Sequence, residues 1–200
     1  MEQVRSFIAI ELPDELRLGI GRLQARLRRA GQPWVKWVDP PGIHLTLKFL
    51  GNIAASRIGD ITRTMGEAAE GVSPFCLEVK GLGVFPNLRR VQVAWVGVSG
   101  ELDQLGRFQQ RLEEGLARLG FAPESRKFTP HLTLARVRDR ASLEERQEFG
   151  RVIVNASLEM DYVIEVRAVS LIKSELTRAG AIYHRIGLVE LGKPLSTATT

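Results

Sequence analysis

The tetrad His44-Leu45-Thr46-Leu47 returns, letter for letter, as His131-Leu132-Thr133-Leu134. The two copies lie a little under half the chain apart, and two of the 3 histidines in 200 residues begin them. Leucine repeats are common in any sequence, whereas a repeated histidine and threonine are not. The repeat therefore indicates an internal duplication, with each half about the size of a βαβ unit and far longer than a solenoid repeat.

Strand geometry gives each tetrad two different faces. Successive side chains of a strand point to opposite sides of the sheet, so the histidine and threonine share one face and the two leucines share the other. We expect the leucines to be buried and each imidazole to lie beside a hydroxyl. Two halves related by a pseudo-twofold axis would then face each other across a central groove and offer these groups to a small anion.

That set of groups suits the hydrolysis of a cyclic phosphodiester. Histidine titrates near neutral pH, so one ring can act as a base toward water while the other protonates the leaving ribose oxygen. The hydroxyls of Thr46 and Thr133, with a backbone N–H or an arginine, would hold the non-bridging phosphate oxygens. The sequence has no acidic cluster suited to a two-metal phosphodiesterase centre, so we expect no metal and no other cofactor.

The composition is that of a soluble globular protein, with 44% hydrophobic and 26% charged residues. No run of about 18 uncharged apolar residues predicts a membrane span, and the N-terminal segment lacks a signal-peptide cleavage site. Cys76 is the only cysteine, which excludes an internal disulfide and a CxxC zinc cluster, so we expect a cytoplasmic protein. The net charge of +5 and the many arginines suit a polyanionic partner, although arginine-rich surfaces often serve solvation alone.

Patterns along the chain predict an α+β fold. Hydrophobic periodicity predicts helices over residues 13–31, 56–69 and 101–119. Ser142 and Glu145 predict a capping box for a fourth, shorter helix. Strands are predicted around His131 and over residues 4–12, 43–50, 75–84, 90–98, 162–172 and 182–191. Several strand pairs are joined by short turns, and no glycine-rich phosphate loop follows any strand, so we expect antiparallel sheets packed against helices.

With these residues in view, the chain resembles the two-histidine (2H) phosphoesterases, and among them the RNA 2′,3′-cyclic phosphodiesterases, also called 2′-5′ RNA ligases. The paired HxTx tetrads define the superfamily, and the blocks around them extend the resemblance over nearly the whole chain. These blocks are RSFIAIELP (5–13), WVDPPGIHLTLKFLGN (37–52), GVFPNLRRVQVAWVGV (83–98), RKFTPHLTLARV (126–137) and SLIKSELTRAGAIYHRI (170–186).

The resemblance implies a bilobal fold and metal-free hydrolysis of RNA 2′,3′-cyclic phosphate ends to 2′-phosphomonoesters. We accordingly expect residues 1–195 to form a single bilobal domain, monomeric, with a disordered tail at 196–200. The resemblance also implies that His44 is the proton donor and His131 the proton acceptor. The residues themselves do not distinguish these roles, because the two tetrads are identical.

The resemblance further implies phosphate contacts from Thr46, Thr133 and Arg136. Strict alternation, however, places Arg136 on the leucine face. It reaches the groove only if the strand twists, bulges or ends after Leu134.

Other residues carry weaker expectations. Lys48 shares the predicted face of the first histidine, so it either attracts phosphate or is a solvated strand end. Arg126 and Phe128 precede the second tetrad; either is a candidate nucleotide contact, although Phe128 is expected in the core. His184 is expected to be structural, and the three tryptophans, Trp34, Trp37 and Trp95, are expected mainly to pack rather than to stack on a base.

Two alternative functions remain open from sequence. The same pair of histidines, run in reverse, would join a 2′,3′-cyclic end to a 5′-hydroxyl and form a 2′-5′ linkage. The other alternative is a non-catalytic module that binds RNA ends, against which the intact histidines and threonines argue.

Overall fold

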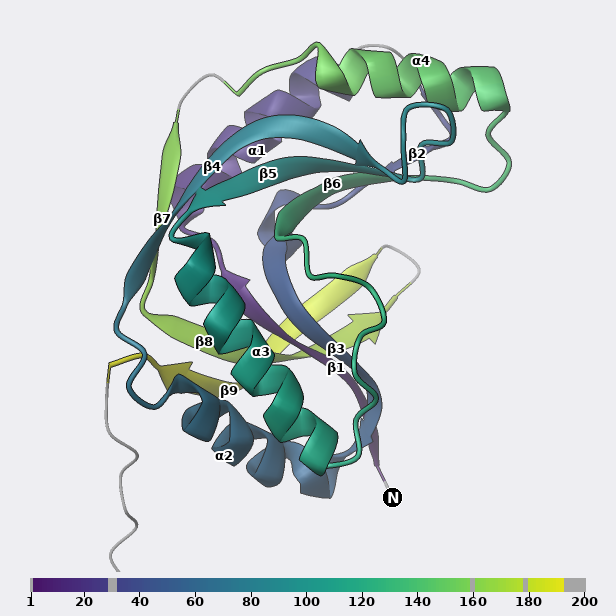
Figure 1. Ribbon diagram of the computed structural model, residues 1–200. Helices are drawn as coiled ribbons and strands as arrows, with labels where there is room; N and C mark the ends of the chain where they lie inside the picture. The colour runs from purple at the N-terminus through teal and green to yellow at the C-terminus, as the bar shows by residue number, and fades with distance from the viewer. Residues whose placement is uncertain (1, 29–31, 159–160, 178–179, 193–200) are drawn as a thin grey trace, which may run out of the picture.

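The computed structural model describes residues 2–28, 32–158, 161–177 and 180–192. Within these ranges its strands form one curved nine-stranded sheet, and every strand pair is antiparallel (Figure 1). The elements in chain order are β1 (Gln3–Glu11), α1 (Asp14–Leu27), β2 (Val35–Trp37), the 3-10 turn η2 (Pro40–Gly42), β3 (His44–Ala54), the 3-10 turn η3 (Ala55–Arg57), α2 (Ile58–Ala69), β4 (Phe75–Phe85), β5 (Val93–Gly100), α3 (Leu102–Arg118), β6 (His131–Val137), α4 (Leu143–Val154), β7 (Tyr162–Val166), β8 (Ala168–Leu176) and β9 (Ala181–Glu190).

The order of the strands shows two equivalent halves. Neighbouring strands run β7-β4-β5-β6-β3-β1-β8-β9, with β2 added beside β6. Reversing this order exchanges β6 with β3, β5 with β1, β4 with β8 and β7 with β9. The two halves therefore meet between β3 and β6, the strands that begin with the two histidines, and the α+β fold with duplicated halves is confirmed.

Each half contributes its first helix to the sheet of the other half. In α1, Gly19 lies so close to β7 that a Cβ there would be 2.1 Å from the hydroxyl of Tyr162. In α3, Glu113 forms an ion pair of 2.8 Å with Lys48 of β3. Figure 1 shows the result, with α1 and α4 over one half of the sheet and α2 and α3 over the other. This exchange of helices holds the two halves in a fixed relation.

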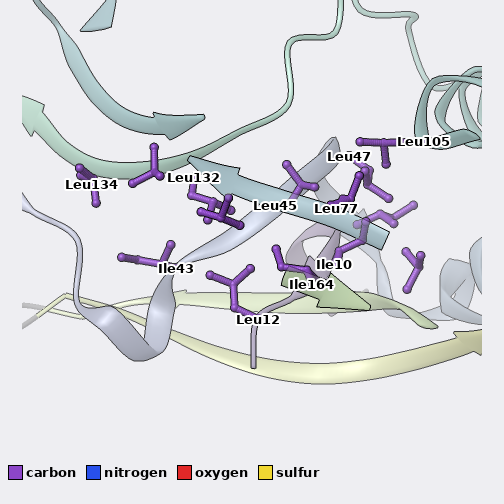
Figure 2. Close-up of a cluster of buried hydrophobic side chains, with 14 of the residues drawn as sticks. Ile10, Leu12, Ile43, Leu45, Leu47, Leu77, Leu105, Leu132, Leu134 and Ile164 are labelled. Atoms are coloured by element: carbon purple, nitrogen blue, oxygen red, sulfur yellow. The ribbon is translucent and has the colours of Figure 1, made fainter. Parts of the chain in front are cut away.

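The tetrad leucines form the centre of the core, as the alternation predicts. Leu45, Leu132 and Leu134 are 0% exposed and Leu47 is 3% exposed. Figure 2 shows them packed with Ile10 and other apolar side chains from the surrounding strands. Fully burying a leucine is worth about 1.5–3 kcal/mol, so this layer strongly favours the strand register that turns the histidines outward.

Helix signals in the sequence correspond to observed boundaries. The Ser142 hydroxyl accepts from Glu145 N, and the Glu145 carboxylate accepts from Ser142 N, which confirms the capping box at the start of α4. Gly120, just past α3, has φ +88°, a left-handed conformation that glycine adopts without a steric penalty. The predicted end of the first helix at Gly31 and the predicted tail at 196–200 lie outside the described residues.

Two strand predictions are corrected by the structure. The single strand expected over 162–172 is two strands, because β7 pairs with β4 up to Val166, whereas β8 begins at Ala168 beside β9 and pairs with β1 from Ser170. The strand expected to begin at Arg90 begins at Val93. The Asn87 side chain accepts hydrogen bonds from the backbone N–H groups of Arg89 and Arg90, which keeps them in a turn.

Candidate active site

The two tetrads lie side by side at the centre of the sheet. β3 and β6 pair at Leu45 and Leu132, both on the core face. In an antiparallel pair, one further step places His44 opposite Thr133 and, in the other direction, Thr46 opposite His131. The two histidines are then diagonal neighbours on the face away from the leucines, with Cβ atoms about 7–8 Å apart. This register places two imidazoles and two hydroxyls on the same face of two adjacent strands.

Both imidazoles are oriented by the same backbone contact. His44 Nδ1 donates to the carbonyl of Gly42 at 2.8 Å, and His131 Nδ1 donates to the carbonyl of Thr129 at 2.7 Å. A carbonyl oxygen only accepts, so Nδ1 carries the proton in each ring. In the neutral ring Nε2 is left with its lone pair, as a base requires, and in the charged ring it carries a proton, as an acid requires. Each histidine is therefore positioned for either role.

Aromatic side chains fix the two rings further. Phe7 stacks on His44 with ring centroids 4.4 Å apart, and Tyr183 meets the same imidazole edge-on at 5.3 Å. Phe85 meets His131 edge-on at 5.0 Å. These contacts restrict the rotation of the imidazoles and surround them with apolar surface.

That apolar surface favours the neutral form of both histidines. Burial, assisted by the charge of Arg17, lowers the pKa of His44 to about 4, although the bond to Gly42 and the charge of Glu11 oppose the change. Burial also lowers the pKa of His131, assisted by the charge of Arg136 and opposed by the bond to Thr129. Without a bound anion, both rings are therefore neutral at physiological pH.

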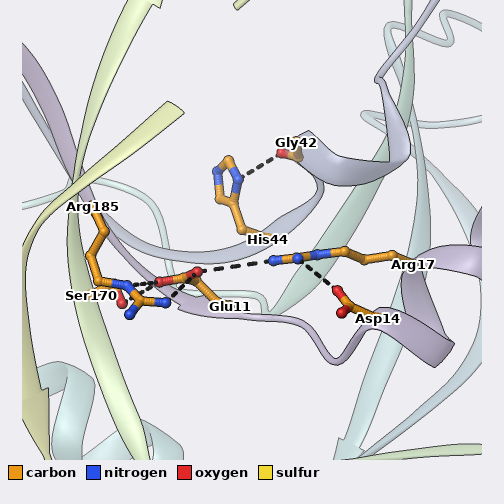
Figure 3. A network of polar contacts seen from close by, with 7 residues as sticks. All are labelled: Glu11, Asp14, Arg17, Gly42, His44, Ser170 and Arg185. Carbon is orange, nitrogen blue, oxygen red and sulfur yellow. Dashed lines mark hydrogen bonds and ion pairs between the residues drawn. The ribbon is translucent and has the colours of Figure 1, made fainter. Parts of the chain in front are cut away.

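Glu11 lies on β1, opposite His44 of β3, and belongs to an ion network beside the site (Figure 3). Its carboxylate accepts from Arg185 at 2.7 and 3.0 Å and from the Ser170 hydroxyl at 2.5 Å, and Arg17 lies 4.0 Å away. The bond from Arg185, aided by Ser170 and by the two arginine charges, holds the pKa of Glu11 below its usual value although burial opposes this. The charged Glu11 thus ties β1 to β8, β9 and α1 behind the histidine.

Two adjoining cavities open on the polar face of the tetrads. The larger, about 690 Å³, is lined by Thr46, His131 and Arg136, among others. The smaller, about 300 Å³, is lined by His44, Thr133 and again Thr46 and Arg136. The two cavities therefore share a wall at the centre of the site. All five site residues expected from the sequence face this space.

A β-bulge brings Arg136 to the groove. β6 pairs Thr133 with Trp95 and Ala135 with Ala94, so Leu134 is an extra residue without a partner on β5. The bulge reverses the alternation that follows it, which buries Ala135 and turns Arg136 toward the histidines. A bulge after Leu134 was one of the three ways in which Arg136 was expected to reach the groove, beside a twist or the end of the strand.

A glutamine from a helix donates to a backbone carbonyl at the bulge in β6, and another does so at a similar bulge in β3. β3 has an equivalent bulge at Leu47, because Thr46 pairs with Ala9 and Lys48 with Ile8. The amide of Gln24 in α1 donates to the carbonyls of Leu134 at 3.1 Å and Val38 at 2.7 Å. Gln109 in α3 reaches the carbonyl of Leu47 at 3.5 Å, the outer limit for a hydrogen bond. Both glutamines are buried, so each half stabilises the strand of the other at its bulge.

The bulge at Leu47 corrects the expectation for Lys48. It turns Lys48 onto the core face, where the residue is 3% exposed and is therefore not a solvated strand end. Its ammonium group donates to Glu113 at 2.8 Å and to the carbonyl of Ala122 at 2.7 Å. Lys48 is therefore a structural cation that ties β3 to α3 and to the segment after it.

The remaining candidates divide between packing and the cavity. Trp34 and Trp37 pack edge-on against Phe149, and Trp95 packs on Phe85. His184 is half-exposed, with Nε2 3.7 Å from Glu175. Arg126 and Phe128 line the larger cavity, and Phe128, half-buried, also packs against the core.

Sequence reasoning missed the residues that hold the imidazoles. Phe7, Phe85 and Tyr183 are far from the tetrads in the chain, and only strand pairing brings them to the rings. A signal existed for the two carbonyls, because each lies two residues before its histidine. In the described ranges, no group of three or more His, Cys, Asp or Glu side chains is placed to hold a metal ion. Nor does any helix there have the length and apolar character needed to cross a membrane.

The chain is similar to known proteins over most of its length. The family model described as "LigT like Phosphoesterase" matches the chain twice, over residues 10–95 and 96–183, which are the two halves of the sequence. These differ from the two halves of the sheet, because β4 lies in the first match and β8 in the second. An RNA 2′,3′-cyclic phosphodiesterase of Methanothermobacter thermautotrophicus is 35% identical over 90% of this chain and 95% of its own. One of Aquifex aeolicus is 34% identical over 78% of this chain and 82% of its own.

Solved structures share the fold. The protein TT0787 of Thermus thermophilus superposes with a TM-score of 0.76 at 27% identity, covering 94% of this chain and 97% of its own. E. coli LigT complexed with NADP+ gives a TM-score of 0.75 at 25% identity, covering 96% of this chain and 100% of its own. The duplicated match and the full-length relatives show that this chain belongs to the LigT-like phosphoesterase family.

Proposed function

We propose that this protein hydrolyses the 2′,3′-cyclic phosphate at the end of an RNA and leaves a 2′-phosphomonoester. The observation that carries the proposal is the pairing of Leu45 with Leu132, which sets two imidazoles diagonally across one face with both Nδ1 atoms fixed. Relatives covering most of this chain are named RNA 2′,3′-cyclic phosphodiesterases, and E. coli LigT has been solved in complex with NADP+.

The reaction assigns one proton transfer to each histidine. His131 Nε2 takes a proton from water as the water oxygen bonds to phosphorus, and His44 Nε2 gives its proton to O3′ as the P–O3′ bond breaks. The attacking and leaving oxygens lie on opposite sides of phosphorus in an in-line displacement. Two imidazoles placed diagonally about one phosphate suit that requirement, and each proton transfer is worth about 10²–10⁴ in rate.

The other groups of the site stabilise the negative charge that develops on the phosphate. Thr46 and Thr133 each lie opposite a histidine, so their hydroxyls can donate to the non-bridging oxygens. Arg136 borders both cavities, and its guanidinium can pair with the same oxygens in a bidentate manner. All of these roles are filled by side chains of the protein, and the proposed reaction requires no metal.

The test uses a short RNA that ends in a 2′,3′-cyclic phosphate, with the product identified as a 2′- or 3′-monoester by phosphorus NMR. We expect the 2′-monoester, unaffected by EDTA, and a loss of about 10²-fold or more for His44→Ala and for His131→Ala. His184→Ala is the matched control and should retain activity, since it removes a histidine that pairs with Glu175. Full activity in both tetrad variants, with their fold verified by circular dichroism, would refute the acid–base mechanism.

The same assay separates the competing reactions. An RNA with a 5′-hydroxyl is added in excess, and a longer, 2′-5′-linked product would show ligation in place of hydrolysis. Tight binding of the cyclic end without any turnover by the wild-type protein would instead support the RNA-end binding module.

A further inference from the structure

The two tetrads are identical, but the residues that lie opposite their histidines are not. Glu11 of β1 pairs directly with His44 of β3. The equivalent pair in the other half of the sheet is Gly97 of β5 with His131 of β6. Residues directly opposite each other in an antiparallel pair share one face of the sheet, with Cβ atoms about 4.5–5.5 Å apart. A carboxylate therefore lies beside one imidazole, and no side chain takes the equivalent position beside the other.

The backbone leaves no room for a carboxylate beside the second histidine. A Cβ at Gly97 would lie 2.6 Å from the carbonyl oxygen of Lys80 on β4. This oxygen belongs to the backbone, so a side chain at position 97 would displace part of β4 from the sheet. The difference between the two histidines is thus built into the strand packing.

The charged and titratable groups around His44 come from four elements. They are Arg5 and Glu11 of β1, Arg17 of α1, His131 and Arg136 of β6, and Tyr183 and Arg185 of β9. Burial raises the pKa of Tyr183, so this side chain is neutral at pH 7 and Glu11 is the anion of the set. The charge of Glu11 raises the pKa of His44, whereas the charge of Arg17 lowers it.

Three neighbouring elements hold the Glu11 carboxylate in this position. It accepts hydrogen bonds from Arg185 of β9 and from the Ser170 hydroxyl of β8, and Arg17 of α1 lies 4.0 Å away. The bond from Arg185 contributes most to keeping the pKa of Glu11 below its usual value, so the carboxylate is ionised at pH 7. Without Glu11, the charges of Arg17 and Arg185 would remain near His44 with no anion between them.

We infer that Glu11 is a positioning residue of the reaction, whose charge offsets the neighbouring arginines and lets His44 hold the proton that it donates to O3′. This inference rests on the proposed function and gives a physical reason why two identical tetrads take different roles. Opposite Gly97, His131 has the cation Arg136 near it and no equivalent anion, which favours the neutral ring that a base requires. His44 is the more deeply buried ring, so charges beside it act through less water.

The test compares substitutions that remove charges of opposite sign. Glu11→Gln removes the anion but keeps an oxygen that can accept from Arg185, and Arg17→Gln removes a cation. Glu175→Gln is the matched control, because it removes a carboxylate that pairs with Lys173 instead. Two quantities are measured after circular dichroism has verified the fold. They are the pH profile of kcat with a 2′,3′-cyclic phosphate and the NMR titration midpoint of His44 in saturating inorganic phosphate.

We expect Glu11→Gln to lower kcat at pH 7 about 3- to 100-fold, because one charge about 6 Å away changes a pKa by about 0.5 to 2 units. A lower pKa leaves less of His44 protonated at pH 7, and a lower pH restores the proton, so the loss should shrink toward pH 5. The midpoint of His44 should fall in Glu11→Gln, rise in Arg17→Gln and stay unchanged in Glu175→Gln.

Three results would overturn the inference. The first is a loss of kcat in Glu11→Gln that is equally large at pH 5 and pH 7, since the effect would then be structural. The second is a midpoint of His44 that moves in the same direction in Glu11→Gln and Arg17→Gln, or that does not move in Glu11→Gln. The third is an equal or larger shift of His131 in Glu11→Gln.

The titration also separates this inference from the proposed function, because it requires no turnover. If the wild-type protein hydrolyses no cyclic phosphate, the proposed function fails, and opposite shifts of His44 in the two variants still support Glu11 as the residue that holds its proton. If the wild-type protein is active and the midpoint of His44 is the same in Glu11→Gln, the inference fails and the proposed function stands.

Discussion

Binding of an anion at the tetrads should raise the pKa of His44. In the free protein, burial lowers this pKa to about 4, so the ring is neutral at pH 7 and unable to act as an acid. The proposed mechanism requires a proton on His44 Nε2 when substrate is bound. The negative charge of the phosphate itself is the group that would hold this proton in place.

The size of the change follows from the geometry of the site. Two histidines with Cβ atoms about 7–8 Å apart place a phosphate lying between them roughly 5 Å from each ring. At that distance and an effective dielectric constant of about 20, one charge contributes about 3 kcal/mol. Since 1.36 kcal/mol corresponds to one pKa unit, the pKa of His44 should rise by about two, to near 6. In a fully hydrated site, with a dielectric constant of about 80, the rise would be only about 0.6.

The measurement is an NMR titration of the histidine ring protons with and without inorganic phosphate, which uses the wild-type protein and does not depend on turnover. The chain has 3 histidines, so His131→Asn and His184→Asn are sufficient to assign the signals. The titration extends from below pH 4 to above about pH 7, so that it spans the midpoint of about 4 in the free protein and the midpoint near 6 expected with phosphate. Below about pH 6 a phosphate group carries close to a single charge.

Two results would refute the reasoning. One is a free protein in which His44 titrates near the usual value for histidine, since the ring would then not be desolvated as its contacts with Phe7 and Tyr183 imply. The other is a titration midpoint that stays in place when saturation with phosphate is shown independently by phosphorus NMR. The bound ion would then lie away from the imidazole, and the proposed position of the phosphate between the two histidines would be wrong.

Two further outcomes are expected from the buried ionisable groups. The pKa values of His44 and His131 lie below their unfolded values, so the unfolded chain binds more protons, and stability should fall as pH decreases from about 6.5 toward 4, by up to about 3 kcal/mol from His44 alone. Urea unfolding across this range should show a smaller loss in His44→Gln, and equal pH dependence in both proteins would contradict the assignment. Lys48→Met should cost about 3–5 kcal/mol because it leaves Glu113 charged without its partner, whereas the double variant Lys48→Met, Glu113→Leu should recover most of this loss. A double variant as unstable as the single one in urea unfolding would show that the ion pair is not the cause.

The two tetrads provided most of the structural information that could be predicted from the sequence. The alternation in His44-Leu45-Thr46-Leu47 predicts buried leucines and a polar face, and the core packing agrees. The second copy predicted two equivalent halves, which the order of strands shows. The capping box at Ser142 was also predictable, because it depends on residues three positions apart in one turn of helix.

Strand boundaries were less predictable where the partner of a strand changes. Val166 and Ala168 belong to strands on different halves of the sheet, although the sequence from 162 to 172 has the composition of one strand. Each stretch satisfies its own local pattern, and only the partner strand determines where the first ends and the second begins. Phe7, Phe85 and Tyr183 reach the imidazoles for the same reason, through pairing across long distances in the chain.

Short-range patterns were sufficient to predict the duplicated halves and the buried face of each tetrad, because these follow from a repeat and from side-chain alternation within a few residues. The orientations of Lys48 and Arg136, in contrast, depend on contacts between distant parts of the chain. Their orientation depends on the bulges at Leu47 and Leu134, whose carbonyls accept hydrogen bonds from glutamines in helices of the opposite half. A bulge reverses the alternation of the side chains that follow it up to the next bulge, and its position depends on neighbouring strands and helices that no local pattern contains.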